Sequence, residues 1–272
     1  MAVPGNNIFG TFLKDRRTRL DPAALGFPLT RRRTPGLRRE EVAQRANVSA
    51  TWYTWLEQGR GGAPSAEVLD RITRALMLTD VEREHLFLLA LGRPPEVRYQ
   101  AIAGVTPRLQ RVLDALELSP ALIKTSTWDV VAWNRAAASV LVDYGALAAE
   151  ERNILRLFFL NRQVRAAQPD WEGTARFVVA AFRAEAARAG AAERVQTLVD
   201  ELSRRSAEFD AMWRDHAVRS YGEGSKHIRH PRAGLIALEY SSFAVDGRPD
   251  LGMVVYSPAT AADAAKIRAL VG

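Results

Sequence analysis

The chain has 272 residues, more than one ordinary domain of about 100 to 200 residues holds, so we expect two domains. Hydrophobic residues make up 47% and charged residues 25%, proportions that argue against disorder and against a coiled coil. The sequence has no apolar run long enough to cross a bilayer, no signal-peptide pattern at its start and no cysteine for disulfides or thiolate metal sites, so we expect a reducing compartment, the cytoplasm.

The net charge of +7 is concentrated at the N-terminus. Residues 1–45 hold ten basic side chains against four acidic ones, and they therefore carry +6 of the total. A basic segment followed by a nearly neutral remainder is typical of a protein whose N-terminal part binds a polyanion. A solvated basic surface without a partner would explain the charge alone equally well.

The spacing of apolar residues predicts five helices in residues 1–95, over about 8–17, 37–46, 49–59, 65–77 and 80–91. Ser49 is placed to cap the third helix, and glycines after residue 58 mark its end. A basic stretch with Pro and Gly separates the first two helices. Pro94 and Pro95 mark a domain boundary, because consecutive prolines cannot continue a helix.

Beyond this boundary the pattern becomes mixed, and residues 99–272 read as an α+β domain. We expect a helix over 107–118, then two short strands within 121–134 that meet near Trp128 and Asp129. Helices follow, the longest over about 192–216. Three strand-like runs at 226–230, 234–245 and 251–257 precede a last short helix, so the expected domain is a small sheet backed by helices.

The second and third helices have the form needed to present one helix to a major groove, because they are short and joined by a tight turn. If Tyr53 and Leu56 pack inward, the opposite face of the third helix carries Thr51, Thr54, Trp55 and Gln58, with Ala50 and Trp52 at its edges. Thr and Gln can bond base edges or phosphates, and Trp can contact a thymine methyl. The alternative for Trp55 is packing against Arg60 or a neighbouring helix.

Residues 37–64 closely resemble the helix-turn-helix of the lambda-repressor-like, xenobiotic-response-element type, with Glu41-Val42-Ala43, Asn47-Val48-Ser49 and Leu56-Glu57-Gln58-Gly59 as its marks. Residues 31–43 resemble the branch of that family whose C-terminal half is an MmyB-like ligand-binding domain. The C-terminal half agrees through Trp128-Asp129, Ala132-Trp133-Asn134, Asp170-Trp171-Glu172, Glu208-Phe209 and Lys226 before His230-Pro231. The resemblance covers nearly all of the chain.

The resemblance implies an all-α five-helix DNA-binding domain that binds double-stranded DNA. It implies base reading by Ala50, Thr51 and Trp55, where many relatives carry Gln or Arg. It implies phosphate contacts from Arg38, Arg39, Gln58 and Arg60, near the helix cap Ser49. Arg31, Arg32 and Arg33 belong to a linker that could line a phosphate backbone or enter a minor groove, and a solvated loop is the alternative.

For residues 99–272 the resemblance implies a PAS-like domain with a pocket, and some relatives resemble binders of long-chain acyl ligands. We therefore expect an elongated, mainly apolar cavity between the sheet and its covering helices, with one or two polar groups for a head group. Its candidate residues are Trp133, Asn134, Arg156, Phe159, Phe177, Trp213, His216, Tyr240 and Tyr256. Plain core packing is the alternative for the aromatic residues, and capping of the following helix is the alternative for Asn134.

An enzyme or a metal site is not expected. His227 and His230 are three apart on a predicted strand, where they would face opposite ways, and no His-Glu-x-x-His helix is present. No cofactor and no membrane partner are expected either. A homodimer is expected, because one such helix contacts only a few base pairs. The remaining alternative is a C-terminal domain that serves only for dimerisation and binds no ligand.

Overall fold

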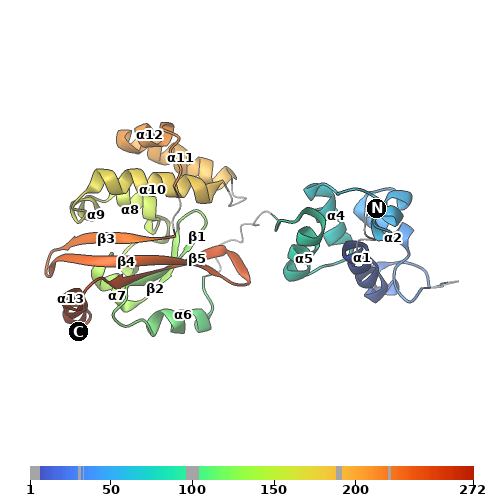
Figure 1. The fold of residues 1–272 in the computed structure, drawn as a ribbon, viewed down its shortest axis with the longest axis horizontal. Coiled ribbons are helices and arrows are strands. Elements are labelled where there is room, and N and C mark those ends of the chain that lie inside the picture. Colours follow the sequence, from blue (N-terminus) through green and yellow to red (C-terminus); the bar gives the residue numbers. More distant parts are fainter. Residues whose placement is uncertain (1–6, 30–31, 33, 96–103, 188–191, 220–221) are drawn as a thin grey trace, which may run out of the picture. The chain divides into compact units, whose positions relative to one another are not determined.

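The computed structural model describes residues 7–29, 32, 34–95, 104–187, 192–219 and 222–272 (Figure 1). The chain forms two compact units, Met1–Pro95 and Glu96–Gly272. The first is helical, and the second combines a five-stranded antiparallel sheet with helices, so the protein is α+β overall. None of the helices in these ranges combines the length and apolar character that a bilayer crossing needs.

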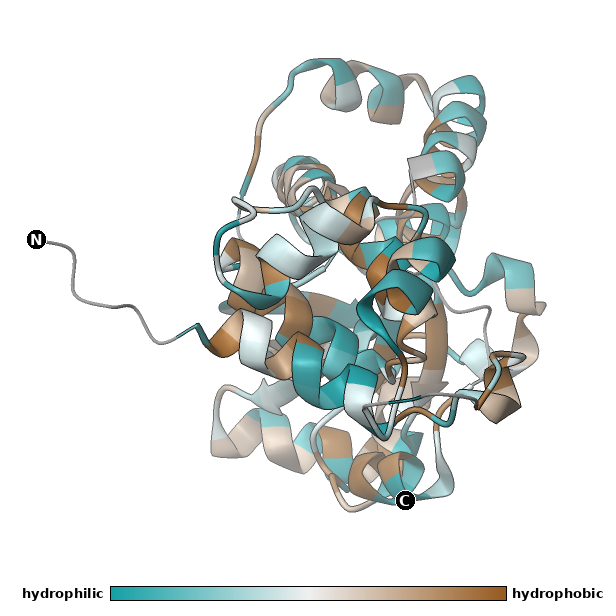
Figure 2. Cartoon of the chain, turned by 90° about the vertical axis from the view of Figure 1, so that its right-hand side faces the viewer, coloured by the Kyte–Doolittle hydropathy of each residue, from teal (hydrophilic) through white to brown (hydrophobic). Residues whose placement is uncertain are grey.

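The N-terminal unit contains the five predicted helices close to their expected limits, together with a short 3-10 turn after the first. They are α1 (Ile8–Arg19), the 3-10 turn (Ala23–Leu25), α2 (Arg39–Ala46), α3 (Ala50–Glu57), α4 (Ala66–Ala75) and α5 (Asp80–Leu91). The helices carry hydrophilic and hydrophobic segments side by side (Figure 2), as amphipathic elements do. Their apolar sides form one core that includes Leu13, Val42, Tyr53, Leu56, Leu69, Ile72, Leu86 and Phe87.

Side-chain caps fix where these helices begin. Ser49 Oγ accepts a hydrogen bond from the backbone N–H of Trp52 at 3.1 Å, the cap that the sequence predicted for α3. Asn47 ends α2 with φ of 52°, a left-handed conformation that asparagine tolerates better than most residues. The tight turn between α2 and α3 therefore follows from Asn47 and Ser49.

The C-terminal unit contains one sheet and several helices. Its elements are α6 (Pro107–Asp114), β1 (Ala121–Thr125), β2 (Val130–Trp133), α7 (Arg135–Val140), 3-10 turns at Tyr144–Ala146 and Ala149–Glu151, α8 (Ile154–Leu160), α9 (Arg162–Ala166), α10 (Trp171–Ala186), α11 (Ala192–Arg205), α12 (Ala207–Arg214), β3 (Glu223–His230), β4 (Gly234–Val245), β5 (Arg248–Pro258) and α13 (Ala261–Val271). The strand order is β2-β1-β5-β4-β3, all neighbours antiparallel.

Alternate residues of the central strands bury opposite faces of the sheet. Ala121 and Ile123 of β1 pack with Leu113 of α6 on one face. Leu122 and Val254 belong to the core on the other face, which includes residues of α8 and α13. Figure 1 shows α6 and α10 on opposite sides of the sheet. A second core is made mainly by residues of α8, α10, α11 and α12.

The prediction of a single helix over 192–216 is wrong, because the helix is interrupted at Ser206. Ser206 is extended (φ −141°), and its hydroxyl accepts a hydrogen bond from the backbone N–H of Phe209, so that it starts a new helix, α12. The apolar spacing continues across the break because Leu202 and Phe209 pack into the same core. His216 lies beyond the end of α12 with φ of 53°.

Candidate DNA-binding surface and ligand pockets

Helix α3 buries one side and presents the other to solvent. Tyr53 and Leu56 are buried, which confirms the inward packing assumed from the sequence. Ala50, Thr51 and Gln58 are exposed, and the indole of Trp55 is 48% exposed. Packing against Arg60 or a neighbouring helix therefore does not remove Trp55 from water. An apolar ring and a threonine thus stand on the outer face of the second helix of the helix-turn-helix.

A buried ion pair fixes α3 against α1. Arg17 Nε lies 2.5 Å from Glu57 Oε1, and the two side chains are only 4% and 1% exposed. Arg17 also donates to the carbonyl of Leu37, so it joins three parts of the unit. Burial alone would lower the pKa of Arg17, but the hydrogen bond to Glu57 raises it. The sequence analysis did not identify this pair, since charged residues so far apart in sequence give no pattern.

Glu57 also forms an ion pair with Arg39, one of the residues predicted to contact phosphate. Arg39 Nε lies 2.6 Å from Glu57 Oε2, yet the Arg39 side chain remains 40% exposed. At the start of α2, the backbone N–H of Arg38 donates to Glu41 Oε2 at 2.7 Å. Arg60 is exposed just after α3. Basic groups therefore lie at the start of α2 and after the end of α3, next to the outer face of α3.

Arg32 is placed differently from what the sequence suggested. Its guanidinium donates to both oxygens of Glu41, at 2.6 and 3.0 Å, and to the carbonyls of Pro28 and Gly36. The side chain is only 8% exposed, so it has little surface left for a phosphate. The expected DNA contact of Arg32 is therefore corrected: its side chain instead holds the linker between α1 and α2 against Glu41. Arg31 and Arg33 lie outside the described residues.

An apolar pocket of about 680 Å³ lies between α7 with its following turn, α9, and the end of β3. Its walls include Leu141, Val142, Val164 and Ile228. Polar groups are also present at His230, whose Nε2 lies 3.1 Å from the carbonyl oxygen of Ser139. This is the form of a site for an apolar ligand with a small polar group.

A smaller pocket of about 350 Å³ lies between the start of α10 and strands β3, β4 and β5. Phe177, Tyr240 and Tyr256 meet there, with ring centroids 6.5 Å apart for Phe177 and Tyr240 and 6.0 Å apart for the two tyrosines. Lys226 also lines this pocket. The pocket combines three aromatic rings with one cationic group, Lys226, and two acidic ones, Asp170 and Glu223.

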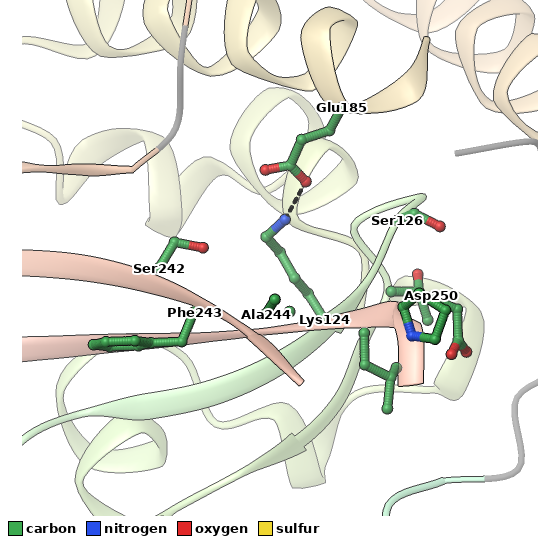
Figure 3. A pocket seen from close by; sticks show the side chains of 11 residues that line it. Lys124, Ser126, Glu185, Ser242, Phe243, Ala244 and Asp250 are labelled. Carbon is green, nitrogen blue, oxygen red and sulfur yellow. Dashed lines mark hydrogen bonds and ion pairs between the residues drawn. The ribbon is translucent and has the colours of Figure 1, made fainter. Parts of the chain in front are cut away.

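A third pocket, of about 300 Å³, contains a salt bridge among the residues that line it (Figure 3). Glu185 reaches from α10 toward Lys124 on β1 and pairs with its ammonium group. Trp128 Nε1 donates to the same carboxylate at 2.6 Å. Burial lowers the pKa of Lys124, and Glu185 opposes this shift. The charges of this pocket are compensated within the protein, which favours a structural role in joining α10 to the sheet.

Two protein-family models match the chain. One describes a helix-turn-helix domain and matches residues 8–86. The other describes the MmyB-like transcription regulator ligand binding domain and matches residues 105–270, more than half of the chain. The chain belongs to the MmyB-like transcription regulators. No curated protein sequence matches it.

Of the nine residues proposed for the ligand site of this regulator, the structure brings Phe177, Tyr240 and Tyr256 together in one pocket. Phe159 lies in the helical core with Phe209, and Trp213 stacks on Phe209 at 5.9 Å. Core packing, the alternative stated for the aromatic residues, therefore describes Phe159 and Trp213 better than a pocket wall does.

The candidates Asn134, Arg156, His216 and Trp133 do not line the pockets described above. Asn134 caps α7 through Ala137 N–H and donates to the carbonyls of Leu113, Leu116 and Ser119, so the capping alternative describes it. Arg156 pairs with Glu201 of α11 at 2.7 Å. His216 is exposed after α12. Trp133 packs beside Tyr144, at 5.4 Å between ring centroids. These placements correct the expectation that all four face one cavity.

The apolar pocket near α7 was missed by the sequence analysis. Its walls are mostly aliphatic residues from three separate segments, and each segment by itself looks like ordinary core. Within the described ranges, no cluster of three or more His, Asp or Glu residues could hold a metal ion.

Proposed function

We propose that this transcription regulator binds DNA sequence-specifically through α3 and that its C-terminal domain binds a small apolar ligand of the fatty-acyl class. The observation that carries the DNA part is the outer face of α3, where Thr51 and a half-exposed Trp55 stand beside basic groups. An indole in water is costly unless a partner covers it, and a major groove offers thymine methyl groups to it.

The proposed base contacts are Ala50, Thr51 and Trp55, and the proposed phosphate contacts are Arg38, Arg39, Gln58 and Arg60. Ser49 orients the start of α3 through its cap. We omit Arg32 because Glu41 and two carbonyls already occupy its guanidinium. Neutralised phosphates release counterions, so affinity should fall steeply with salt.

The experiment for the DNA part is a salt titration of the full chain on duplex DNA. The logarithm of the affinity is expected to fall linearly with the logarithm of salt concentration. Arg38→Ala is expected to weaken binding to all sequences and to reduce the slope by about one. Salt-independent binding, or no binding at low salt, would reject the assignment.

The apolar ligand is proposed for the pocket between α7, α9 and β3. Its size of about 680 Å³ and its aliphatic walls suit an acyl chain, and His230 with Asn161 supplies polar groups for a head group. The strand order β2-β1-β5-β4-β3 supports the PAS-like description of the domain. A ligand can regulate DNA binding only if it binds one arrangement of the protein better than another.

A homodimer in the cytoplasm completes the proposal, because paired half-sites multiply the affinity of one short helix. The competing function is a C-terminal domain that only dimerises. Mass spectrometry of a denatured extract of purified protein separates the two. A co-purified acyl molecule that changes DNA affinity on titration supports sensing, and a protein without such a molecule and without response to added fatty acids leaves the dimerisation function.

A further inference from the structure

Two lysines lie on the same face of the sheet beneath α10. Lys124 is on β1, two residues from Leu122, which pairs with Val254 of β5. Two residues further along β5, Tyr256 pairs with Tyr240 of β4. Lys226 of β3 pairs with Leu238, two residues from Tyr240. Because side chains alternate along a strand, Lys124 and Lys226 point to the same side.

The two lysines differ in their counter-ions. Glu185, at the C-terminal end of α10, pairs with Lys124. Lys226 lines the pocket at the other end of the helix, where its Nζ lies 3.4 Å from Gln168 Oε1 and 5.8 Å from the centroid of the Phe158 ring. Among the described residues no carboxylate lies within ion-pair distance of Lys226. Burial of its ammonium group lowers its pKa to about 8.

Lys226 is partly buried and has no carboxylate beside it among the described residues, so its ammonium group loses hydration without a full counter-charge. An anion in the adjacent cavity would offset that cost. The pocket around Lys226 measures about 350 Å³, half the volume of the apolar pocket. The acidic groups that line it are Asp170, which caps Gly173 N–H of α10, and the exposed Glu223 at the start of β3. Neither forms an ion pair with Lys226.

Three aromatic rings form part of the wall of this pocket. Phe177 comes from α10, and Tyr240 and Tyr256 come from neighbouring strands. Gly224 makes room for Tyr240, since a Cβ atom on it would lie 2.8 Å from the tyrosine hydroxyl. Aromatic rings contact other rings edge-on or in offset stacks with centroids about 4.5–7 Å apart. A flat ring would therefore fit these walls better than a long flexible chain.

We propose that the pocket between α10 and strands β3, β4 and β5 binds a small aromatic carboxylate whose anionic group pairs with Lys226. This site is separate from the pocket proposed for an acyl ligand, and it goes beyond the function proposed above. The ligand carboxylate would neutralise Lys226 in the way that Glu185 neutralises Lys124. The aromatic ring of the ligand occupies the space bounded by Phe177, Tyr240 and Tyr256.

The test is calorimetric titration of the full chain with benzoate, phenylacetate and indole-3-acetate, each beside its uncharged amide. At least one acid is expected to bind and its amide to bind more weakly. Lys226→Met should weaken binding of the acid on the order of 10–100-fold, because a charge-assisted hydrogen bond is lost. Lys14→Met, a change at an exposed lysine of the other unit, is the matched control and should bind as the wild type does.

Two further readouts keep the outcomes separate. Thermal unfolding of Lys226→Met should occur at or above the wild-type temperature, because a desolvated charge is removed. Lys226→Met should also leave the response to fatty acids unchanged. The proposal is overturned if none of the three acids binds at millimolar concentration, if acid and amide bind equally, if Lys226→Met binds as the wild type does, or if that variant abolishes the fatty-acid response instead.

Discussion

Replacement of Glu57 by leucine is expected to cost about 3–5 kcal/mol of the stability of the N-terminal unit. The change leaves Arg17, whose side chain is 4% exposed, without its carboxylate partner. Removal of one partner from a buried ion pair typically costs that amount, because the other charge remains desolvated. The lost contact with Arg39, a half-exposed side chain, adds about 1 kcal/mol at most. The loss is large beside a typical domain stability of about 5–15 kcal/mol.

Hydrogen exchange of the full chain, read segment by segment by mass spectrometry, measures the free energy of opening of α1 and α3. The matched control is the double variant Arg17→Met with Glu57→Leu, in which an apolar pair replaces the charged one. It should recover most of the loss, since apolar replacements of buried ion pairs are often neutral or stabilising. An opening free energy of Glu57→Leu within about 1 kcal/mol of wild type, or a double variant no better than the single one, would refute the reasoning.

Three further changes test other parts of the account by chemical or thermal unfolding. Asn134→Ala should destabilise the C-terminal unit by about 2–4 kcal/mol, because it removes a helix cap and leaves three carbonyls and the Ala121 N–H without their partner. Asn161→Ala removes only a helix cap and should cost about 1 kcal/mol. Equal costs for the two variants would contradict this explanation. Gly59→Ala should cost more than the roughly 1 kcal/mol expected of Gly62→Ala, because both have positive φ but only Gly59 would place its Cβ 2.9 Å from Asn7. Burial alone would raise the pKa of Glu41, but hydrogen bonds from Arg32 and the Arg38 backbone lower it. The ionised Glu41 therefore stabilises the fold above the usual pKa of about 4.3, and this stabilisation is lost as pH falls through the lower pKa of the folded state. Glu41→Gln should flatten the dependence of the free energy of unfolding on acid pH, and an unchanged pH profile would count against this explanation.

The helices of the N-terminal unit and the outer face of α3 could be predicted because their signals are local. Apolar spacing places Tyr53 and Leu56 inside, and a helix with that inner side must present Thr51 and Trp55 outward. Ser49 and Asn47 mark the turn by their own side-chain chemistry and backbone preference. The same information does not predict the partner of Arg32, because its contact with Glu41 depends on how the linker folds back.

The C-terminal pockets depend on contacts between distant segments, which the sequence did not reveal. The residues that line the apolar pocket come from α7, α9 and β3, and none of these segments has a distinctive spacing. The break at Ser206 was missed because the apolar positions stay in phase across it. Among the nine proposed ligand residues, Asn134 looked equally suited to a pocket and to a helix cap. Only its five backbone contacts, with three carbonyls within and after α6 and with the N–H groups of Ala121 and Ala137, distinguish the two.

The central claim is that α3 reads DNA sequence, and selection of binding sites from randomised duplexes by the full chain tests it most directly. Wild type, Arg38→Ala, Thr51→Ala and Trp55→Ala would be compared at one salt concentration. Arg38→Ala should select the wild-type sequence with lower affinity, whereas Thr51→Ala and Trp55→Ala should change the preferred base, by about 1–3 kcal/mol for each lost base contact. An unchanged selected sequence in both α3 variants, or a preference altered only by substitutions in residues 104–272, would contradict the account.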